Sequence, residues 1–275
     1  MSADALLASD APLNCHLLSG CGFPAPGADI FIYPSIWSFH LLGIQFEINK
    51  PMILLVIGAA AVAIFFIVAF RKAKVVPGGL QNLAEYGYTF VRDGIARDTI
   101  GKGSDRYVPF LFTMFFMVWV FNFMGILPFA QFPVASRFAI PVAFAAMVYL
   151  LWVPLGMMKQ GPVNFLKAMT MPPDVPKALY ILLIPIEVVS NFLVRPFTHS
   201  VRLFANMFAG HLLIVTFSAA AWYLLSPSFI GVVGSGASFV VAIGLTGFEV
   251  LIQALQAYVF TLLAAVYIND AIHAH

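Results

Sequence analysis

The sequence predicts an all-α integral membrane protein with about three or four ordinary membrane helices and two long, steeply tilted helices that form a membrane-embedded hairpin. Three observations lead to this fold class. Of the 275 residues, 61% are hydrophobic and only 9% are charged, whereas a soluble domain carries roughly a quarter charged residues. Several apolar tracts are long enough to cross a membrane core of about 30 Å. The last tract, residues 178–268, is too long for one ordinary span.

The distribution of basic residues gives the expected orientation. Residues 1–50 hold four acids and one Lys, whereas the loop 71–107 holds seven Lys and Arg residues. Because loops rich in Lys and Arg stay in the cytoplasm, we expect 1–50 to be an outer N-terminal segment. Cys15 and Cys21 lie in that segment. An oxidising exterior permits a disulfide between them, and the sequence leaves open whether it forms.

A polytopic membrane domain is expected over 51–268, followed by a cytoplasmic tail over 269–275. Its ordinary spans are expected at about 51–70, 108–128 and 138–158.

Between the first two spans, residues 77–100 begin with Pro-Gly-Gly and have a helical pattern. One side of that helix would carry Leu80, Leu83, Tyr86, Phe90 and Val91. This spacing predicts an amphipathic helix at the cytoplasmic membrane surface. An ordinary solvent-exposed loop is the alternative.

The long tract divides near the Ser-Pro-Ser at 226–228 into the segments 178–225 and 229–268. As helices, each would reach roughly 60–70 Å, about twice the membrane core. An ordinary tilt of about 20° cannot absorb that length. We therefore expect an antiparallel hairpin that lies close to the membrane plane. Pro185 and Pro196 are expected to bend its first helix.

Arg202 is the last Lys or Arg of the chain, and 73 apolar-rich residues follow it. At about 100° per residue, several polar and small residues share its helical face: Arg195, Thr198, His199, Ala205, Asn206 and Ala209. Small residues let another helix approach closely. A packing seam with snorkelling arginines is the structural alternative. Ionisable residues inside a membrane usually mark a functional site, so we interpret Arg202 as functional.

The second long helix has a polar stripe of its own: Glu249, Gln253, Gln256 and, at its end, Phe260. A buried carboxylate without a partner costs several kcal/mol. His211 is the nearest candidate in a hairpin, and a His–Glu pair can relay protons. Three further polar residues lie in apolar segments, where they either line water or bond the backbone: Glu187, Asn191 and Asn122.

Other classes of function have little support. The sequence contains no His-Glu-x-x-His zinc motif, no phosphate-binding Gly-x-x-x-x-Gly-Lys loop and no cluster of metal ligands. No cofactor is expected, and nucleic-acid binding is excluded because the basic residues form no patch interleaved with aromatics. The Gly-Ala-Ser-Phe at 236–239 offers only a weak intramembrane serine-protease reading.

The segment 202–211, RLFANMFAGH, and the segment 251–268, LIQALQAYVFTLLAAVYI, resemble the subunit a family of rotary F-type ATP synthases. The resemblance extends plausibly over about 50–268. It implies two tilted helices packed against a ring of c subunits, with peripheral-stalk b subunits and the lipid bilayer as further partners. It also implies an energy-transducing membrane, most simply the bacterial plasma membrane.

The resemblance also implies roles for individual residues. Arg202 matches the arginine that faces the ring carboxylate, Asn206 its polar neighbour, and Gln256 the glutamine of the last helix. His211 and Glu249 match a coupled pair in the proton-access path, in the reverse order to some members.

The chain departs from the family pattern at two positions. Ala205 replaces the usual Gly of the arginine motif, and Gly125 stands where some relatives have an Asp.

The expected function is that of a non-catalytic stator subunit. Two offset half-channels would load and unload the carboxylates of the rotating ring, and so couple proton flow to ATP synthesis. The alternative is a secondary transporter that binds an anionic substrate at Arg202, although the sequence has no inverted repeat. Whether the ion is H⁺ or Na⁺ stays open.

Overall fold

The computed structural model describes most of the chain from residue 23 onward. The described residues are 23, 25–31, 33, 37–41, 44–71, 73–76, 78–127, 130–171, 176 and 179–273. The all-α fold class is confirmed over these residues, which are mostly helical. Cys15 and Cys21 lie outside them, so whether they pair stays open.

The N-terminal part contains a small element that the sequence did not predict. A 3₁₀ turn, η2 (Ala28–Phe31), precedes strand β1 (Trp37–Leu41), which pairs antiparallel with β2 (Ile44–Ile48). Helix α2 (Lys50–Phe70) follows directly and coincides with the expected span 51–70 to within one residue. Its start is fixed by the Asn49 side chain, which accepts a hydrogen bond from the Met52 N–H at 3.3 Å.

The amphipathic segment is confirmed as a helix. Helix α3 (Leu80–Val91) continues through a π-helical turn, η3 (Arg92–Arg97), into α4 (Asp98–Ile100), and a 3₁₀ turn, η4 (Ser104–Arg106), follows. Most of its predicted apolar side is exposed, as an interfacial helix requires: Leu80, Leu83, Tyr86 and Phe90. Val91 differs, because it is completely buried in the core.

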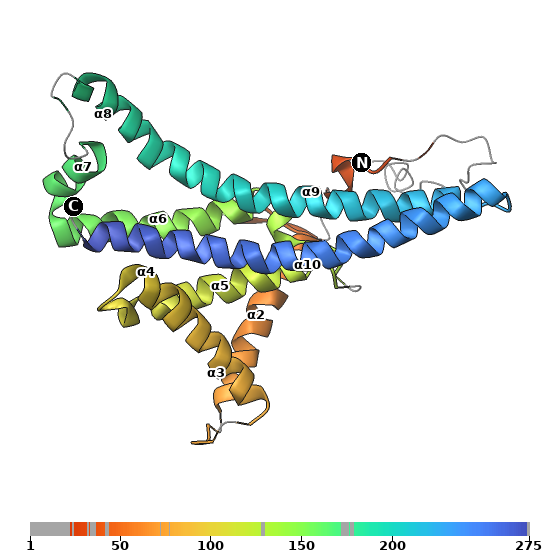
Figure 1. Ribbon diagram of the computed structural model, residues 1–275, viewed down its shortest axis with the longest axis horizontal. Coiled ribbons are helices and arrows are strands. Elements are labelled where there is room, and N and C mark those ends of the chain that lie inside the picture. Colours follow the sequence, from red (N-terminus) through yellow and green to blue (C-terminus); the bar gives the residue numbers. More distant parts are fainter. Residues whose placement is uncertain are drawn as a thin grey trace.

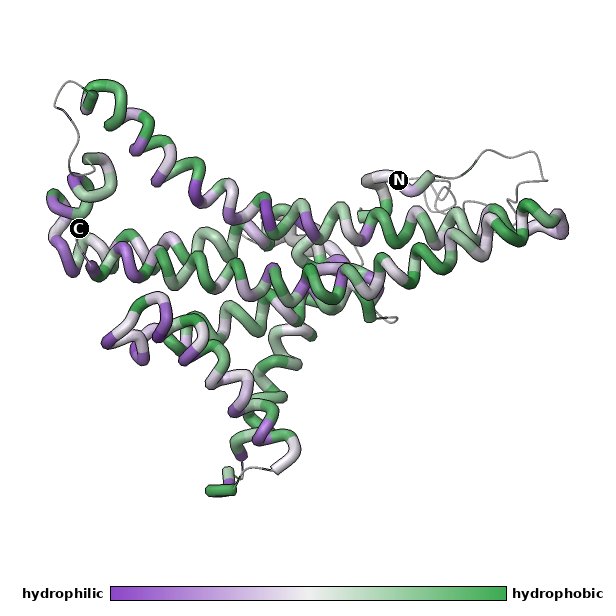
Figure 2. The backbone as a smooth tube through the Cα atoms, viewed as in Figure 1, coloured by the Kyte–Doolittle hydropathy of each residue, from purple (hydrophilic) through white to green (hydrophobic). Residues whose placement is uncertain are grey.

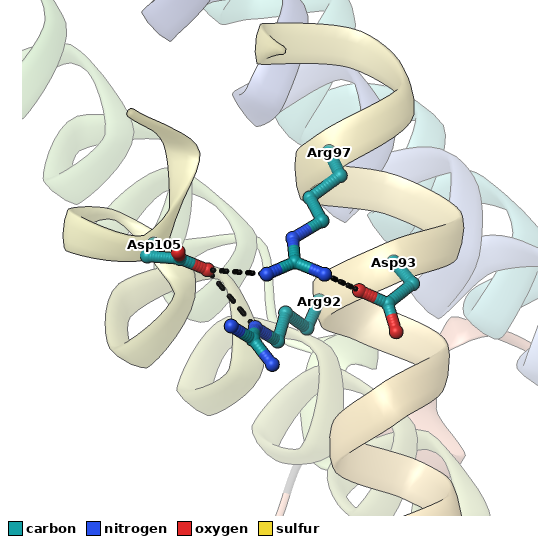
Figure 3. A network of polar contacts seen from close by, with 4 residues as sticks. All are labelled: Arg92, Asp93, Arg97 and Asp105. Carbon is teal, nitrogen blue, oxygen red and sulfur yellow. Dashed lines mark hydrogen bonds and ion pairs between the residues drawn. The ribbon is translucent and has the colours of Figure 1, made fainter. Parts of the chain in front are cut away.

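A network of ion pairs joins the π-helical turn to the following loop (Figure 3). Arg92 Nε lies 2.9 Å from Asp105 Oδ1. Arg97 bridges Asp93 at 2.8 Å and the same Asp105 oxygen at 3.5 Å. All four side chains are at least one-third exposed, so each pair is weak by itself and the network acts mainly to orient the turn.

The next helices are α5 (Val108–Phe123), α6 (Ala139–Gln160) and α7 (Pro162–Thr170), with a 3₁₀ turn, η5 (Val134–Ser136), before α6. Helix α5 ends five residues earlier than the expected span 108–128, because the chain turns at Met124–Ile126. At about 1.5 Å per residue it reaches roughly 24 Å, less than a full membrane core.

The long hairpin has the expected form. Helices α8 (Tyr180–Val189) and α9 (Arg195–Leu224) are joined by a π-helical turn, η7 (Ser190–Val194), into one continuous segment of 45 residues. Helix α10 (Phe229–Ile272) has 44 residues, hence about 66 Å. It continues four residues beyond the expected end at 268, so most of the predicted tail is helical.

The first long helix contains a π-helical turn that the sequence did not predict, whereas a bend at its two prolines stays a prediction. Pro185 lies inside α8 and Pro196 in the first turn of α9, and the π-helical turn η7 lies between them. A π turn adds one residue to a helical turn. A wheel of 100° per residue is therefore valid within α9 and fails across η7.

Helix α10 is the centre of the packing and contacts α9, α5 and α6 (Figure 1). Helix α8 diverges from α10, whereas α2 and α3 form a V that projects from the opposite side. Hydrophobic residues dominate the long helices, and hydrophilic residues gather around η3 and α4 (Figure 2). The tilt of the hairpin in a membrane stays a prediction, and so does the orientation derived from the basic residues.

Candidate functional site

The packing of α9 leaves the Arg202 side of the helix uncovered. Leu203 and Met207, one turn apart, are completely buried and anchor α9 in the core. The neighbouring positions Arg202, Asn206 and Ala209 are exposed. A long membrane helix that leaves an arginine and small residues exposed presents a face to which another subunit can pack.

Two residues that the helical wheel placed on the Arg202 face, His199 and Arg195, pack against α10 instead. His199 is only 2% exposed, because its ring lies on Phe260 of α10, with ring centroids 3.8 Å apart. Arg195 is half-buried over the ring of Tyr267, with its guanidinium carbon 5.7 Å from the ring centroid. These two side chains turn toward α10, so the exposed face is narrower than the helical wheel predicted.

Asn206 connects this face to α10. Its Nδ2 donates a hydrogen bond to Gln256 Oε1 at 2.8 Å. Gln256 is only 4% exposed, and its Nε2 has no partner among the described residues. Two residues that the sequence placed on separate helices therefore meet one turn from Arg202. Arg202 itself forms no ion pair with any residue that the structure describes.

Glu249 and Gln253 continue the polar stripe of α10. Gln253 Nε2 donates to Glu249 Oε1 at 3.4 Å, and both side chains are buried. Glu249 packs against Gly210 of α9, where a Cβ atom would lie 3.4 Å from the carboxyl carbon. The other Glu249 oxygen has no hydrogen-bond partner in the described part of the chain. A carboxyl group with one free oxygen is suited to exchange a proton with water.

The structure shows no direct contact between His211 and Glu249, and their coupling in the proton path stays a prediction. Within the described residues they form neither a hydrogen bond nor an ion pair, and Gly210 is the α9 residue against the carboxyl group. His211 instead lies edge-on to Phe31, with ring centroids 5.8 Å apart. The two residues nevertheless lie close along the hairpin, because Thr246, one turn before Glu249, lines the same cavity as His211.

That cavity has a volume of about 390 Å³ and is lined by residues of η2, α9 and α10 together with residues of connecting segments. Its polar lining is Tyr33, Gln131, His211, Ser218 and Thr246. Gly125 also lines it, and a Cβ at that position would lie 2.9 Å from Pro133 and 3.2 Å from the Asn122 carbonyl oxygen. The space that an Asp would need is therefore filled, which accounts physically for the Gly found there.

A second polar cavity, of about 190 Å³, lies on the other side of Arg202 along α9. It is lined by Glu187, Asn191 and Arg195 together with Asp270 and His273. Asn191 Nδ2 donates to Glu187 Oε2 at 3.0 Å and to the Met169 carbonyl at 2.6 Å. Of the two alternatives for Glu187, lining a polar space is therefore the one the structure favours.

Asn122 is completely buried near the end of α5, and neither of its side-chain polar atoms has a partner among the described residues. Buried polar groups without a protein partner commonly bond an ordered water. The structure places Asn122 beside Gly125 and so close to the first cavity, but not in its lining.

Several residues of the site were missed from the sequence. Tyr33 comes from the N-terminal segment, which carries no recognisable motif, and Asp270 was assigned to a tail. Thr246 could have been found, because it precedes Glu249 by three residues and shares its side of α10. No group of three or more metal-ligating side chains occurs in the described residues.

The position of Arg202 relative to the two polar cavities is the main feature of the site. Arg202 lies between the two polar cavities along the hairpin, nine residues before His211 and seven after Arg195. At about 1.5 Å per residue, these separations are roughly 14 Å and 10 Å. An exposed fixed cation therefore separates two polar spaces that have no lining residue in common.

Comparisons with known proteins identify the family of the chain. The family model described as ATP synthase A chain matches residues 52–269. The protein named ATP synthase subunit a of Streptomyces lividans is 46% identical and aligns over all of this chain and 97% of its own length. The protein of the same name from Frankia alni is 43% identical over 93% of this chain and 88% of its own, and that of Rhodococcus erythropolis is 39% identical over 100% and 98%. A match of this extent shows that the chain belongs to the ATP synthase A chain family.

Proposed function

We propose that this chain provides two offset proton half-channels, and that Arg202 is the fixed charge between them. The family is the proton-translocating stator subunit of the membrane sector of ATP synthase, and its members here are bacterial multi-pass membrane proteins. The observation that carries the residue-level proposal is the exposed Arg202, without an ion pair in the described residues, between two separate polar cavities.

The mechanism follows from the chemistry of arginine. A carboxylate carried on a moving partner would meet Arg202 at the exposed face of α9. The positive charge favours the ionised form of that carboxylate, so the proton is released before the carboxylate passes. Arginine keeps its own proton and cannot relay it. A direct leak between the cavities is blocked, and each proton crosses only by riding on the partner.

We assign the cavity at His211 to the outer half-channel. It includes residues of the N-terminal segment, which the distribution of basic residues places outside. Protons would reach Glu249 through water between His211 and Thr246, since the carboxyl group has one oxygen free of protein partners. Gln253, Asn206 and Gln256 then extend the polar stripe toward Arg202.

We assign the cavity at Glu187 to the inner half-channel. Its lining includes Asp270 and His273, at the end of the chain that the orientation places in the cytoplasm. A proton released at Arg202 would leave through this polar space. The driving force is about 2.3 kcal/mol per proton for each 100 mV of membrane potential.

The chain acts in this proposal without catalysing a covalent step. Its partners would be the c subunits of the ring at the Arg202 face and the b subunits of the peripheral stalk elsewhere. The alternative of a secondary transporter for an anionic substrate has no support in the comparisons, in which the relatives are named ATP synthase subunit a.

Cross-linking tests whether the ring covers this face. A cysteine at Ala209 lies on the exposed Arg202 side, whereas a cysteine at Phe197, which is 58% exposed, lies about 140° around the helix from Arg202. In the assembled complex we expect Ala209→Cys to cross-link to a small ring subunit and Phe197→Cys not to do so. Equal cross-linking of both, or of Phe197→Cys alone, would contradict the proposed face. A functional complex that purifies without any ring of small hairpin proteins would contradict the proposed function itself.

A further inference from the structure

An apolar groove of about 580 Å³ lies between α2, α3 and α5, within the V that α2 and α3 form (Figure 1). Its lining carries aliphatic and aromatic side chains and takes no part in the proton path. The residues that face it from α2 are Ala61, Val62, Phe65 and Phe66. Those from α3 and α5 include Leu83, Tyr86, Phe90, Phe115 and Trp119. Such a volume is within the range of sites that bind small molecules.

The back of the groove is closed by a cluster of aromatic rings. Phe66 lies edge-on to Phe112 and Phe116, with ring centroids 4.6 and 4.9 Å apart. Gly87 of α3 is packed so closely that a Cβ there would lie 2.8 Å from Phe116. The groove is therefore an apolar slot with packed aromatic rings along one wall.

Two cations lie at the end where α2 and α3 meet. Arg71 follows the last residue of α2 directly, and both Arg71 and Lys74 are exposed. The loop that carries Lys74 is held to the start of α3: the Lys74 N–H donates to Gln81 Oε1 at 3.0 Å, and Gln81 Nε2 donates to the Lys74 carbonyl at 2.9 Å. Gln81 is two residues from Leu83, which lines the groove. Lys74, and Arg71 at the end of α2, therefore lie near the end of the groove where α2 and α3 meet.

The groove is expected to lie at the level of the membrane that lipid acyl chains occupy. Its α2 residues, 61 to 66, precede the end of α2 by four to nine residues, which is about 6–14 Å along the helix. The basic loop 71–107 places this end of α2 at the cytoplasmic surface. A phospholipid whose phosphate lies at that surface extends its acyl chain through this depth of the inner leaflet.

We propose that this groove binds an acyl chain of an anionic phospholipid, and that Arg71 and Lys74 hold its phosphate. The apolar slot accounts for the chain, and the two cations account for the negative headgroup. A membrane helix of a partner subunit is the competing occupant. A helix would insert separate side chains into the groove, whereas an acyl chain can run along it and bring its phosphate toward the two cations. The slot and its charges therefore favour a lipid.

Photolabelling tests the proposal on the assembled complex. The complex is placed in nanodiscs that contain phosphatidylglycerol with a diazirine in one acyl chain, and the labelled peptides are mapped after irradiation. Phosphatidylcholine with the same chain is the neutral comparison. We expect labelling of α2, α3 and α5 at the groove, stronger for phosphatidylglycerol by roughly thirtyfold, which corresponds to about 1 kcal/mol for each of two basic residues near a membrane surface.

Two pairs of variants separate the chain site from the headgroup site. Ala61→Trp fills the groove and should remove the label, whereas Ile67→Trp adds the same side chain on the opposite, 66% exposed side of α2 and should not. Arg71→Gln with Lys74→Gln should abolish the preference for phosphatidylglycerol while labelling by both lipids persists. As a matched control, Lys102→Gln with Lys159→Gln removes two other exposed cations and should preserve the preference.

Three results would overturn the proposal. The first is labelling of Ala61→Trp equal to that of the unsubstituted complex. The second is the same phosphatidylglycerol preference after loss of Arg71 and Lys74. The third comes from a photoreactive side chain placed at Ala61: if it cross-links to another subunit and not to lipid, a helix fills the slot. None of these results depends on the proton path, because ATP-driven proton pumping is not the readout.

Discussion

At the scale of single residues, the hydrogen bond between Asn206 and Gln256 is the contact that positions the arginine face. It is a side-chain bond between the two long helices, one turn from Arg202. Gln256 is almost completely buried, so a lost partner would leave both ends of its amide without a bond. An unsatisfied buried polar group costs about 1–3 kcal/mol.

A double-mutant cycle tests this contact. Asn206→Leu and Gln256→Leu should each lower ATP-driven proton pumping by several-fold, because each leaves the other amide unpaired. The double variant should lose less than the sum of the two, since no unpaired amide remains. Pumping is measured as acidification of vesicles that hold the assembled complex. Strictly additive losses would show that the two side chains act independently.

Gly210 sets the space available to Glu249. A Cβ at this position lies at ordinary contact distance, 3.4 Å, from the carboxyl carbon. Gly210→Ala should therefore keep most of the pumping activity, whereas Gly210→Val adds methyl groups that displace the carboxyl group and should reduce it at least tenfold. Gly236→Val on α10, where a Cβ meets nothing within 4 Å, is the control for helix propensity. Similar losses for the two valine variants would refute the steric explanation.

At the scale of secondary-structure elements, the sequence predicted the long helices but not the features that depend on tertiary packing. The two long helices were predicted from the length of their apolar segments, each of which is about twice the thickness of the membrane core. That length led to the expectation of a hairpin near the membrane plane. Arg202 and Glu249 could be found because charged residues are so rare in their surroundings. The π-helical turn η7 and the pairing of β1 with β2 could not be found, since both depend on tertiary packing that no local pattern records. A direct His211–Glu249 contact is absent among the described residues, since Gly210 is the α9 residue that packs against the carboxyl group.

Removal of one residue tests the role of η7. The turn sets the rotation of α8, and hence of Glu187, relative to α9. Deletion of Leu193, which is 66% exposed, should convert the turn to regular α-helix and rotate Glu187 by about 100° away from its cavity. Proton pumping should fall strongly, while Leu193→Ala, which keeps the residue count, should pump normally. Normal pumping by the deletion variant would show that the register across η7 is unimportant.

The loop network provides a prediction of pH dependence. The hydrogen bond from Arg92 holds the pKa of the Asp105 carboxyl below its ordinary value. A carboxyl group whose pKa is lowered by folding stabilises the folded state at pH values above the ordinary carboxyl pKa of about 4. This stabilisation is lost as the pH falls through the lowered pKa. Hydrogen exchange of the η3 and η4 amides, corrected for intrinsic rates, should therefore increase in acid.

Asp105→Asn should show the fast exchange already at neutral pH, without a further change in acid. Both effects should weaken in high salt, because the four side chains are exposed. Unchanged exchange in Asp105→Asn at neutral pH would mean that the network does not order this loop.

At the scale of the whole molecule, the fold separates two polar spaces with one helix. Helix α9 is anchored in the core by Leu203 and Met207, and it lines one polar cavity from His211 onward and the other up to Arg195. Arg202 lies between them, on a side of α9 where the described residues leave it exposed. A rotating partner at that face would pass from one cavity to the other and meet the cation between them.

The most direct test of this account measures coupled pumping and passive leakage separately in vesicles that contain the assembled complex. Arg202→Ala should abolish ATP-driven acidification and should preserve or increase passive proton flux, because nothing then separates the half-channels. Arg202→Lys should couple poorly, since lysine can give up its proton when buried. Arg106→Ala, which removes an exposed arginine of the cytoplasmic loop, should pump normally. Coupled pumping by Arg202→Ala at the level of the unsubstituted complex would contradict the central role of this residue.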